Sequence, residues 1–321
     1  MATSTIGTGQ TYTTVKAWEA AKQGDFVTAT EGQRGEMLAE TFDEDQLQFS
    51  GSTTDATYKW TLTCASGAEH GGVAGDGAIL YSNYTGSSWN TITIVDDYME
   101  VLDIEVIADH SNIRCIGSST GSDGHIDIKR VLGHGGGTID PSYCYNFNAG
   151  TGTVTVESCC GYNTQRGCYG KTDTTKVTVL HCTFVEEQTD DSESGKPGCW
   201  LVTAKNTVCF HFGGLSGWAD FNSINAGSTK CAADDATGTE SGLDNLTPEN
   251  ELTDLTDYAM DLHIAPGGTG TLIGAGATGL GVSTDLAGNS FNTPPSIGCF
   301  ELVAAGGATY AGYVQSKGGW W

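Results

Sequence analysis

The sequence has little proline, few basic residues and no long apolar run. Only 6 of its 321 residues are proline, against 46 glycines. Nowhere does it approach the roughly 20 consecutive apolar residues that cross a bilayer, which argues against a membrane-spanning helix. Residues 1–5 are polar, without the basic and apolar regions of a secretory signal peptide. We therefore expect synthesis in a cytoplasm, with no secretion route of its own.

Basic residues are scarce enough to exclude several partners. Lys and Arg total 14 against 39 Asp and Glu, a formal net charge of −25. A field of this sign repels phosphate backbones and anionic lipids, so neither nucleic acid nor a membrane surface is an expected partner. The acidic residues are spread along the chain and no EF-hand loop is present. No cofactor is expected, and Ca²⁺ along acidic turns is an option without support.

The eleven cysteines fit neither zinc nor thioredoxin chemistry, because no two of them stand in a C-x-x-C pair. Two interpretations stay open. Most thiols are buried and pack as small apolar side chains, or they form disulfides once the protein reaches an oxidising medium. Because the number is odd, at least one thiol is expected to be free or bonded to another chain.

A short apolar pattern recurs along the middle of the chain. Segments that start at Met99, Ile126, Val154 and Val177 carry apolar residues at relative positions 0, +2 and +5, and their starts lie 27, 28 and 23 residues apart. A weaker copy starts at Asn206, 29 residues after the last of these. The positions assigned to the protein interior are Met99, Val101, Ile104, Ile126, Ile128, Val131, Val154, Val156, Cys159, Val177, Val179 and Cys182.

This repeat predicts an all-β fold, a right-handed parallel β-helix in which each bent strand is part of one coil. A single coil cannot bury its inward face, so stacking at about 4.8 Å per coil supplies the core. Cys159 and Cys182 then share an interior column, whereas Cys160 points the other way and is expected to be exposed. The alternative is a β-sandwich, but sandwich strands recur every 8 to 12 residues with hairpin turns that are scarce here.

A single short helix is expected near the N-terminus, around residues 15–21, where Val15 and Trp18 share a face and Thr13 or Thr14 can cap the start. The expected organisation is an N-terminal cap with this helix over residues 1–60, the β-helix and its closing segment over residues 61–301, and a Gly- and aromatic-rich tail over residues 302–321.

Both ends of the chain resemble parallel β-helix proteins of the pectate-lyase-like superfamily, in a form frequent in tailed bacteriophages and environmental sequences. Residues 6–21, IGTGQTYTTVKAWEAA, followed by Gly24 and Asp25, are similar to its N-terminal cap, and TDLAGN at 284–289 with SIGCFE at 296–301 is similar to its closing segment. Cys299 stands where that pattern usually has Ala. The resemblance implies the fold and leaves the chemistry open, because lyases, hydrolases, adhesins, tailspikes and structural virion parts share it.

No catalytic residue and no metal ligand is assigned from the sequence. Lys129 and Arg130 stand together on one expected strand, but a solvated strand residue explains each of them. His125, His134, His181 and His211 show no metal-binding spacing. With 39 acidic residues, carboxylate pairs at glycosidase distance arise by chance. A glycan-binding groove is a further option, because Trp89, Trp200 and Trp218 could stack on sugars but could equally be core residues.

The function expected from these observations is structural. We expect a virion protein of a tailed bacteriophage, a capsid-surface decoration or minor capsid protein held by other virion proteins as a homo-oligomer or bound to the capsid, and not an enzyme. The alternatives are a tailspike or fibre receptor-binding protein or polysaccharide depolymerase, and a secreted bacterial adhesin at the cell surface. Candidates for subunit contacts or cross-links are Cys160, Cys299, Trp320 and Trp321.

Overall fold

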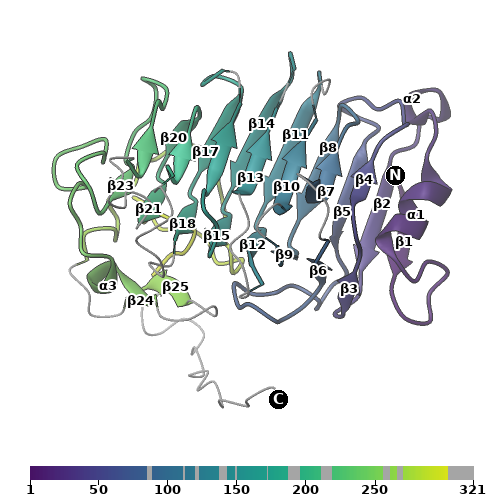
Figure 1. Cartoon of the computed structure of the whole chain (residues 1–321), viewed down its shortest axis with the longest axis horizontal. Helices are drawn as coiled ribbons and strands as arrows, with labels where there is room; N and C mark the ends of the chain where they lie inside the picture. The colour runs from purple at the N-terminus through teal and green to yellow at the C-terminus, as the bar shows by residue number, and fades with distance from the viewer. Residues whose placement is uncertain are drawn as a thin grey trace.

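The computed structural model shows a right-handed parallel β-helix whose coils stack side by side along the long axis of the molecule (Figure 1). Three parallel sheets form its faces. The structure describes residues 1–84, 89–110, 113–119, 123–136, 143–148, 150–171, 173–186, 196–210, 219–255, 261–265 and 270–302. The all-β class and the β-helix architecture predicted from the sequence are confirmed.

The first sheet takes one strand from each successive coil, in the order β1-β2-β5-β8-β11-β14-β17-β20. The apolar repeat found in the sequence corresponds to strands of this sheet. Its strands are β1 (Ala2–Ile6), β2 (Gln33–Met37), β5 (Trp60–Cys64), β8 (Met99–Leu102), β11 (His125–Lys129), β14 (Thr153–Glu157), β17 (Val177–Leu180) and β20 (Thr203–Lys205).

The second and third sheets complete each coil. The second sheet contains β3 (Thr41–Asp43), β6 (Ile79–Ser82), β9 (Glu105–Ala108), β12 (Leu132–Gly135), β15 (Cys160–Tyr162), β18 (Thr183–Val185), β21 (Val208–Phe210) and β23 (Ala232–Ala233). The third sheet contains β4 (Leu47–Phe49), β7 (Trp89–Ile94), β10 (Ile113–Ser118), β13 (Tyr143–Phe147), β16 (Cys168–Gly170), β19 (Cys199–Trp200) and β22 (Phe221–Asn222).

Parallel register stacks the repeated apolar positions into columns. Ile126 pairs with Met99 and with Val154, and Val154 pairs with Val177. The twelve positions assigned to the interior all lie in the core with at most 1% of their surface exposed. Alternating polar residues of the same strands face outward, because successive side chains of a strand point to opposite faces.

The fifth copy of the repeat is the one that was aligned incorrectly. The copy expected at Asn206 belongs partly to β21 of the second sheet, and the first sheet continues instead through β20. Register pairs Val179 with Ala204, so a small side chain takes the interior position there. An alanine carries too weak a hydrophobic signal for a pattern of branched apolar residues to detect.

The N-terminal end of the core is closed by the predicted helix. α1 spans Val15–Lys22, and the Thr14 hydroxyl accepts from the Ala17 amide at 3.1 Å, as expected for a capping threonine. The Trp18 ring lies 5.2 Å from the Trp60 ring in an edge-to-face contact. A further short helix, α2, spans Phe26–Ala29. The first-sheet ladder includes β1 and β2, so it begins inside the range assigned to the cap.

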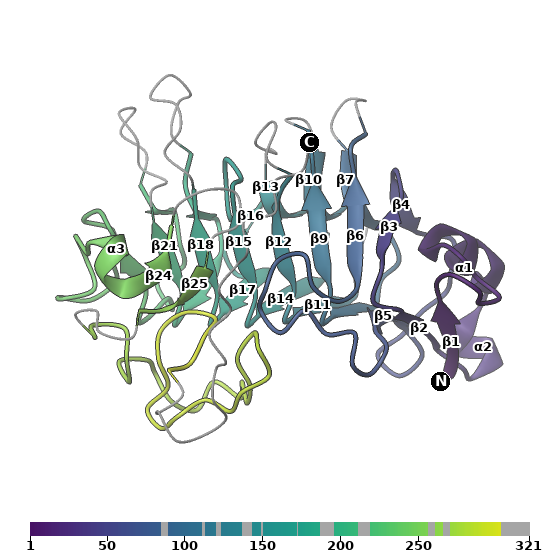
Figure 2. The ribbon, with the colours of Figure 1, turned by 90° about the horizontal axis from the view of Figure 1, so that it is seen from below.

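The chain after β23 returns along the outside of the coils. It forms α3 (Pro248–Glu251) and the antiparallel pair β24 (Leu252–Asp254) and β25 (Asp261–Ile264). We call residues 270–302 the C-terminal strap, which runs beside the sheets in Figure 2. Its apolar side chains and those of the outer face of the second sheet form a second hydrophobic cluster. The strap contributes Leu272, Leu286, Ile297, Cys299 and Phe300 to this cluster.

This strap overturns the expectation that Cys160 is exposed. Cys160 does point away from the coil interior, but it is 1% exposed and Cys299 is fully buried, because the strap covers β15. All eleven cysteines are buried free thiols. Trp320 and Trp321 lie outside the described residues. In the part of the chain that the structure describes, no helix is long and apolar enough to cross a membrane.

Candidate functional site: an aromatic–arginine ladder

The outer face of the third sheet carries a row of aromatic and arginine side chains from consecutive coils. Its members, which we call the aromatic–arginine ladder, are Arg114, Tyr143, Arg166, Tyr169 and Trp200. Register pairs Arg114 with Tyr143 and Tyr169 with Trp200. Because strands of a sheet lie about 4.8 Å apart, the three steps from β10 to β19 extend the row over about 14 Å.

The three rings are stacked on one another. The Tyr143 and Tyr169 centroids lie 5.5 Å apart with planes 18° from parallel, and those of Tyr169 and Trp200 lie 4.8 Å apart at 26°. All three side chains are partly exposed. Stacked aromatic residues on one face of a parallel ladder leave a flat apolar edge in contact with solvent, which is a large amphipathic contact area with few rotatable bonds.

Two guanidinium groups lie against these rings. The central carbon of Arg166 is 4.6 Å from the Tyr143 centroid and 5.5 Å from that of Trp200, and the central carbon of Arg114 is 5.2 Å from the Tyr143 centroid. Arg166 also donates a hydrogen bond to the Tyr143 hydroxyl. Cations within about 6 Å of a ring face are attracted by its quadrupole.

Among the described residues, these two arginines have no carboxylate partner, unlike Arg34 and Arg130. Arg34 pairs with Glu36 at 2.8 Å, and Arg130 donates to Asp103 at 2.5 and 2.8 Å. Within the described residues, neither ladder arginine is paired with an acid, and the Nε atoms of both are buried without a hydrogen-bond partner. Burial and the nearby Arg166 charge lower the pKa of Arg114. Two like charges on one tyrosine form a small cationic area on a strongly acidic protein.

Asparagines border the ladder on both sides. Asn146 pairs with Tyr169 across the sheet, Asn222 pairs with Trp200, and Asn90 pairs with Arg114. The Asn90 Oδ1 atom is buried without a donor among the described residues. Gly117 lies between Asn90 and Asn146, and a Cβ there would approach the Asn90 amide oxygen to 2.6 Å. Asn90 and Asn146 are buried, so Asn222 is the partly exposed amide beside the stacking surface.

The outer face of the first sheet is also charged, but its charges neutralise one another. Glu100 pairs with Lys59 at 2.8 Å, and Asp127 contacts His125 at 3.2 Å and Lys129 at 3.5 Å. Lys129 thus faces outward on β11, whereas Arg130 is at the following turn with a positive φ of 49° and pairs with Asp103. Internal pairing leaves this face less able to attract a charged ligand.

The histidines are dispersed through the fold. His134 is buried against Glu105, with 2.7 Å between Nε2 and Oε1, and its ring stacks on Tyr162 at 4.6 Å. His181 lies at the turn after β17, points out of the coil and is covered by the strap. His211 lies outside the described residues. No group of three or more His, Cys, Asp or Glu side chains could hold a metal ion in the described part of the chain.

One member of the ladder, Trp200, was expected from the sequence to be able to stack on sugars. The side chains of Trp89 and Trp218 lie outside the described part. Both tyrosines and both arginines were missed. A signal was present, because Cys168-Tyr169 and Cys199-Trp200 each place an aromatic residue directly after a buried cysteine. Tyr143 and Arg114 instead precede a buried cysteine, so the pattern changes register between coils.

Comparisons with known proteins find likeness at the level of the coordinates only. No protein-family model and no curated protein matches this chain. The deglycosylated form of the pectin methylesterase from Aspergillus niger is 15% identical over 72% of this chain and 82% of its own, with a TM-score of 0.41. The penultimately deglycosylated form of that protein is 15% identical over 80% and 91%, with a TM-score of 0.38. At these values the likeness says nothing about what this chain binds.

Proposed function

We propose that this chain is a β-helix protein that binds an acidic polysaccharide along its third sheet. The observation that carries the proposal is the ladder itself, where two arginines without a carboxylate partner in the described part lie on three stacked rings. Sugar rings present apolar C–H faces that stack on Tyr and Trp, and carboxylates accept hydrogen bonds from guanidinium groups. The two parts of the ladder therefore match the two parts of a uronic acid.

The repeat of the fold favours a polymer as the ligand. Successive coils place side chains about 4.8 Å apart along one face, so a chain of repeating units can contact several coils at once. Single-stranded nucleic acid also combines stacking faces with negative charge. The formal net charge of −25 opposes both polyanions alike, so the titration described below decides between them.

Binding without cleavage is part of the proposal. Hydrolysis of a glycosidic bond uses two carboxyl groups about 5 to 10 Å apart. No acidic side chain contacts the ladder among the residues described, and the paired acids of the first sheet lie on another face. The depolymerase alternative is tested by incubating the protein with the polysaccharide and measuring new reducing ends or unsaturated products.

The experiment that tests the binding proposal is calorimetric titration with sodium alginate, with neutral dextran and a single-stranded oligonucleotide as comparisons. We expect binding of alginate that weakens with added salt, and weaker or no binding of dextran. Equal binding of alginate and dextran would show that the arginines do not contribute to the affinity. Preference for the oligonucleotide would replace the polysaccharide with nucleic acid as the partner.

The virion role expected from the sequence stays a proposal beside this one. It is supported by the likeness of residues 6–21 and 284–301 to β-helix proteins frequent in tailed bacteriophages. A polysaccharide-binding face suits a particle protein that contacts a bacterial surface, so the two proposals are compatible. Electron microscopy of source particles labelled with an antibody against this chain tests it, with label on particles expected and particles free of label as the contrary result.

A further inference from the structure

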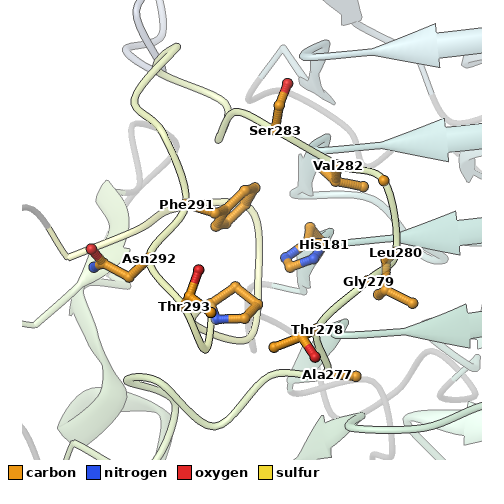
Figure 3. Close-up of a pocket in the computed structure, with 12 residues that line it drawn as sticks. His181, Ala277, Thr278, Gly279, Leu280, Val282, Ser283, Phe291, Asn292 and Thr293 are labelled. Carbon is orange, nitrogen blue, oxygen red and sulfur yellow. The ribbon is translucent and has the colours of Figure 1, made fainter.

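A cavity lies on another face, between the C-terminal strap and the turn that follows β17. Two arms of the strap, residues 277–283 and 291–295, surround a space of about 180 Å³ (Figure 3). The His181 ring projects into this space from the coil side, and the Phe291 ring lies 4.2 Å from it. These elements are separate from the third sheet, so the inference does not depend on the aromatic–arginine ladder.

Asn206 fixes both the strap and the histidine. Its Oδ1 atom accepts from the Ala277 amide at 2.7 Å, and its Nδ2 atom donates to the Ala277 carbonyl at 2.9 Å. The same Nδ2 atom lies 2.9 Å from the His181 Nε2 atom. Because the Ala277 backbone sets which end of the amide is the donor, His181 Nε2 must accept the remaining hydrogen.

The histidine is therefore neutral and carries its proton on Nδ1. His181 is 2% exposed, and its Nδ1 atom is buried. Burial lowers the pKa of His181 to about 4, against the opposing influence of the Glu301 charge and the Ser296 carbonyl. A ligand in the cavity therefore meets a neutral imidazole and not a cation.

The lining defines the chemistry of that ligand. Phe291, Leu280 and Pro295 supply apolar surface, and Thr278, Ser283 and Thr293 supply hydroxyl groups. The buried Glu301 carboxylate, held by Ser296 and Asn292, places negative charge nearby that opposes an anionic ligand. A neutral imidazole does not offset it. The cavity thus suits an uncharged molecule with one apolar face and several hydroxyl groups.

We infer that this cavity binds a neutral monosaccharide unit, with a C–H face against Phe291 and its hydroxyl groups hydrogen-bonded to the Thr and Ser side chains of the lining. Stacking of a sugar on an aromatic ring and hydrogen bonds from its hydroxyls fit the lining and the size of the space. The cavity is thus a second binding site, which favours a neutral ligand, whereas the ladder favours an acidic one.

Saturation-transfer NMR with methyl α-D-glucoside, methyl α-D-galactoside and N-acetylglucosamine tests the inference, with glucuronate as the charged counterpart. At least one neutral sugar should receive saturation and shift the ¹⁵N resonance of the His181 ring. Val282→Trp fills the cavity and should abolish both effects. Ile273→Trp, an exposed position of the same strap outside the lining, should change neither.

Three results would overturn the inference. If no neutral sugar receives saturation, the cavity binds water and no sugar. Transfer that survives Val282→Trp, or that leaves the His181 resonance unmoved, would place the sugar elsewhere. Stronger binding of glucuronate at this site would contradict the charge argument. Circular dichroism melting of both tryptophan variants shows whether a lost signal reflects a filled cavity or an unfolded strap.

Discussion

The rings of Tyr169 and Trp200 lie 4.8 Å apart on adjacent coils, with their planes 26° from parallel. The spacing is that of the sheet itself, so backbone register holds the two rings face to face without any ligand. A surface formed in advance has less side-chain entropy to lose on binding. The ladder is therefore preorganised for a flat, repeating partner.

Removal of the two ladder arginines should weaken binding of an acidic polysaccharide. For Arg114→Ala with Arg166→Ala we expect an affinity loss of roughly tenfold or more, because each charge-assisted contact contributes about 1 to 2 kcal/mol. Calorimetry on alginate measures it. Arg34→Ala is the matched control, since Arg34 pairs with Glu36 on the first sheet. Equal losses in the control and the double variant would show a nonspecific charge effect.

The stacking contribution should depend on ring area. Trp200→Ala is expected to lower the affinity for alginate by roughly five- to tenfold, and Trp200→Phe to recover part of it, because a smaller ring still stacks. Folding should be unaffected, since the Trp200 side chain is partly exposed. Fluorescence and melting curves check this. An unchanged affinity in Trp200→Ala would take the ring out of the binding surface.

The architecture of the coils was accessible from the sequence, whereas the ladder and the strap were not. Branched apolar residues such as Ile126 and Val154 repeat because every coil must bury the same inward position. Outward-facing residues do not have to be apolar, so Tyr143 and Arg166 form no recognisable repeat in the sequence. Their contact becomes visible only in the folded structure. The burial of Cys160 depends on Cys299, 139 residues later, and a local pattern cannot report a contact at that separation.

The interior columns should respond strongly to loss of volume. Val156 is fully buried and pairs with Val179 of the next coil. Val156→Ala should lower the free energy of unfolding by about 2 kcal/mol, because it removes buried methyl groups and leaves a cavity. The outward neighbour Thr155→Ala should change it by less than about 0.5 kcal/mol. Denaturant titration measures both, and equal effects would contradict the assigned faces.

The thiols should be unreactive in the folded protein. Burial raises the pKa of Cys160 well above its usual value, which disfavours the reactive thiolate. We expect slow labelling by maleimide in the native state and labelling of all eleven cysteines after denaturation. The Cys160 and Cys299 thiols contact each other and are buried, so copper-phenanthroline should join neither of them to another chain while the protein is folded. Covalent dimers on non-reducing gels would contradict this and favour a cross-link between subunits.

Acid should loosen the strap through His181. Its pKa is about 4 when folded and about 6.5 in an unfolded chain, so between these values only the unfolded chain takes up the proton. The free energy of unfolding should therefore fall as pH drops from about 6.5 to about 4, by about 3 kcal/mol at most, and level off below. Protonation of His181 Nε2 also removes the acceptor of the hydrogen bond from the Asn206 amide.

Buried carboxyl groups act in the opposite sense and must be separated from this effect. Burial raises the pKa of Glu44 and of Asp285, so these groups add stability as pH falls through their folded values. Comparison of wild type with His181→Asn isolates the histidine, because Asn tolerates the positive φ of 51° at this turn. The difference between the two unfolding curves should vary with pH. A difference that is constant from pH 7 to pH 4 would contradict the buried, neutral histidine.

Polysaccharide binding on the third sheet can be located by a crystal structure of the protein soaked with an alginate oligosaccharide. We expect sugar rings stacked over Tyr169 and Trp200, with a uronate carboxylate in hydrogen-bonding distance of Arg114 or Arg166. Oligosaccharide bound on the charged face of the first sheet instead, with the aromatic–arginine ladder empty, would contradict the account.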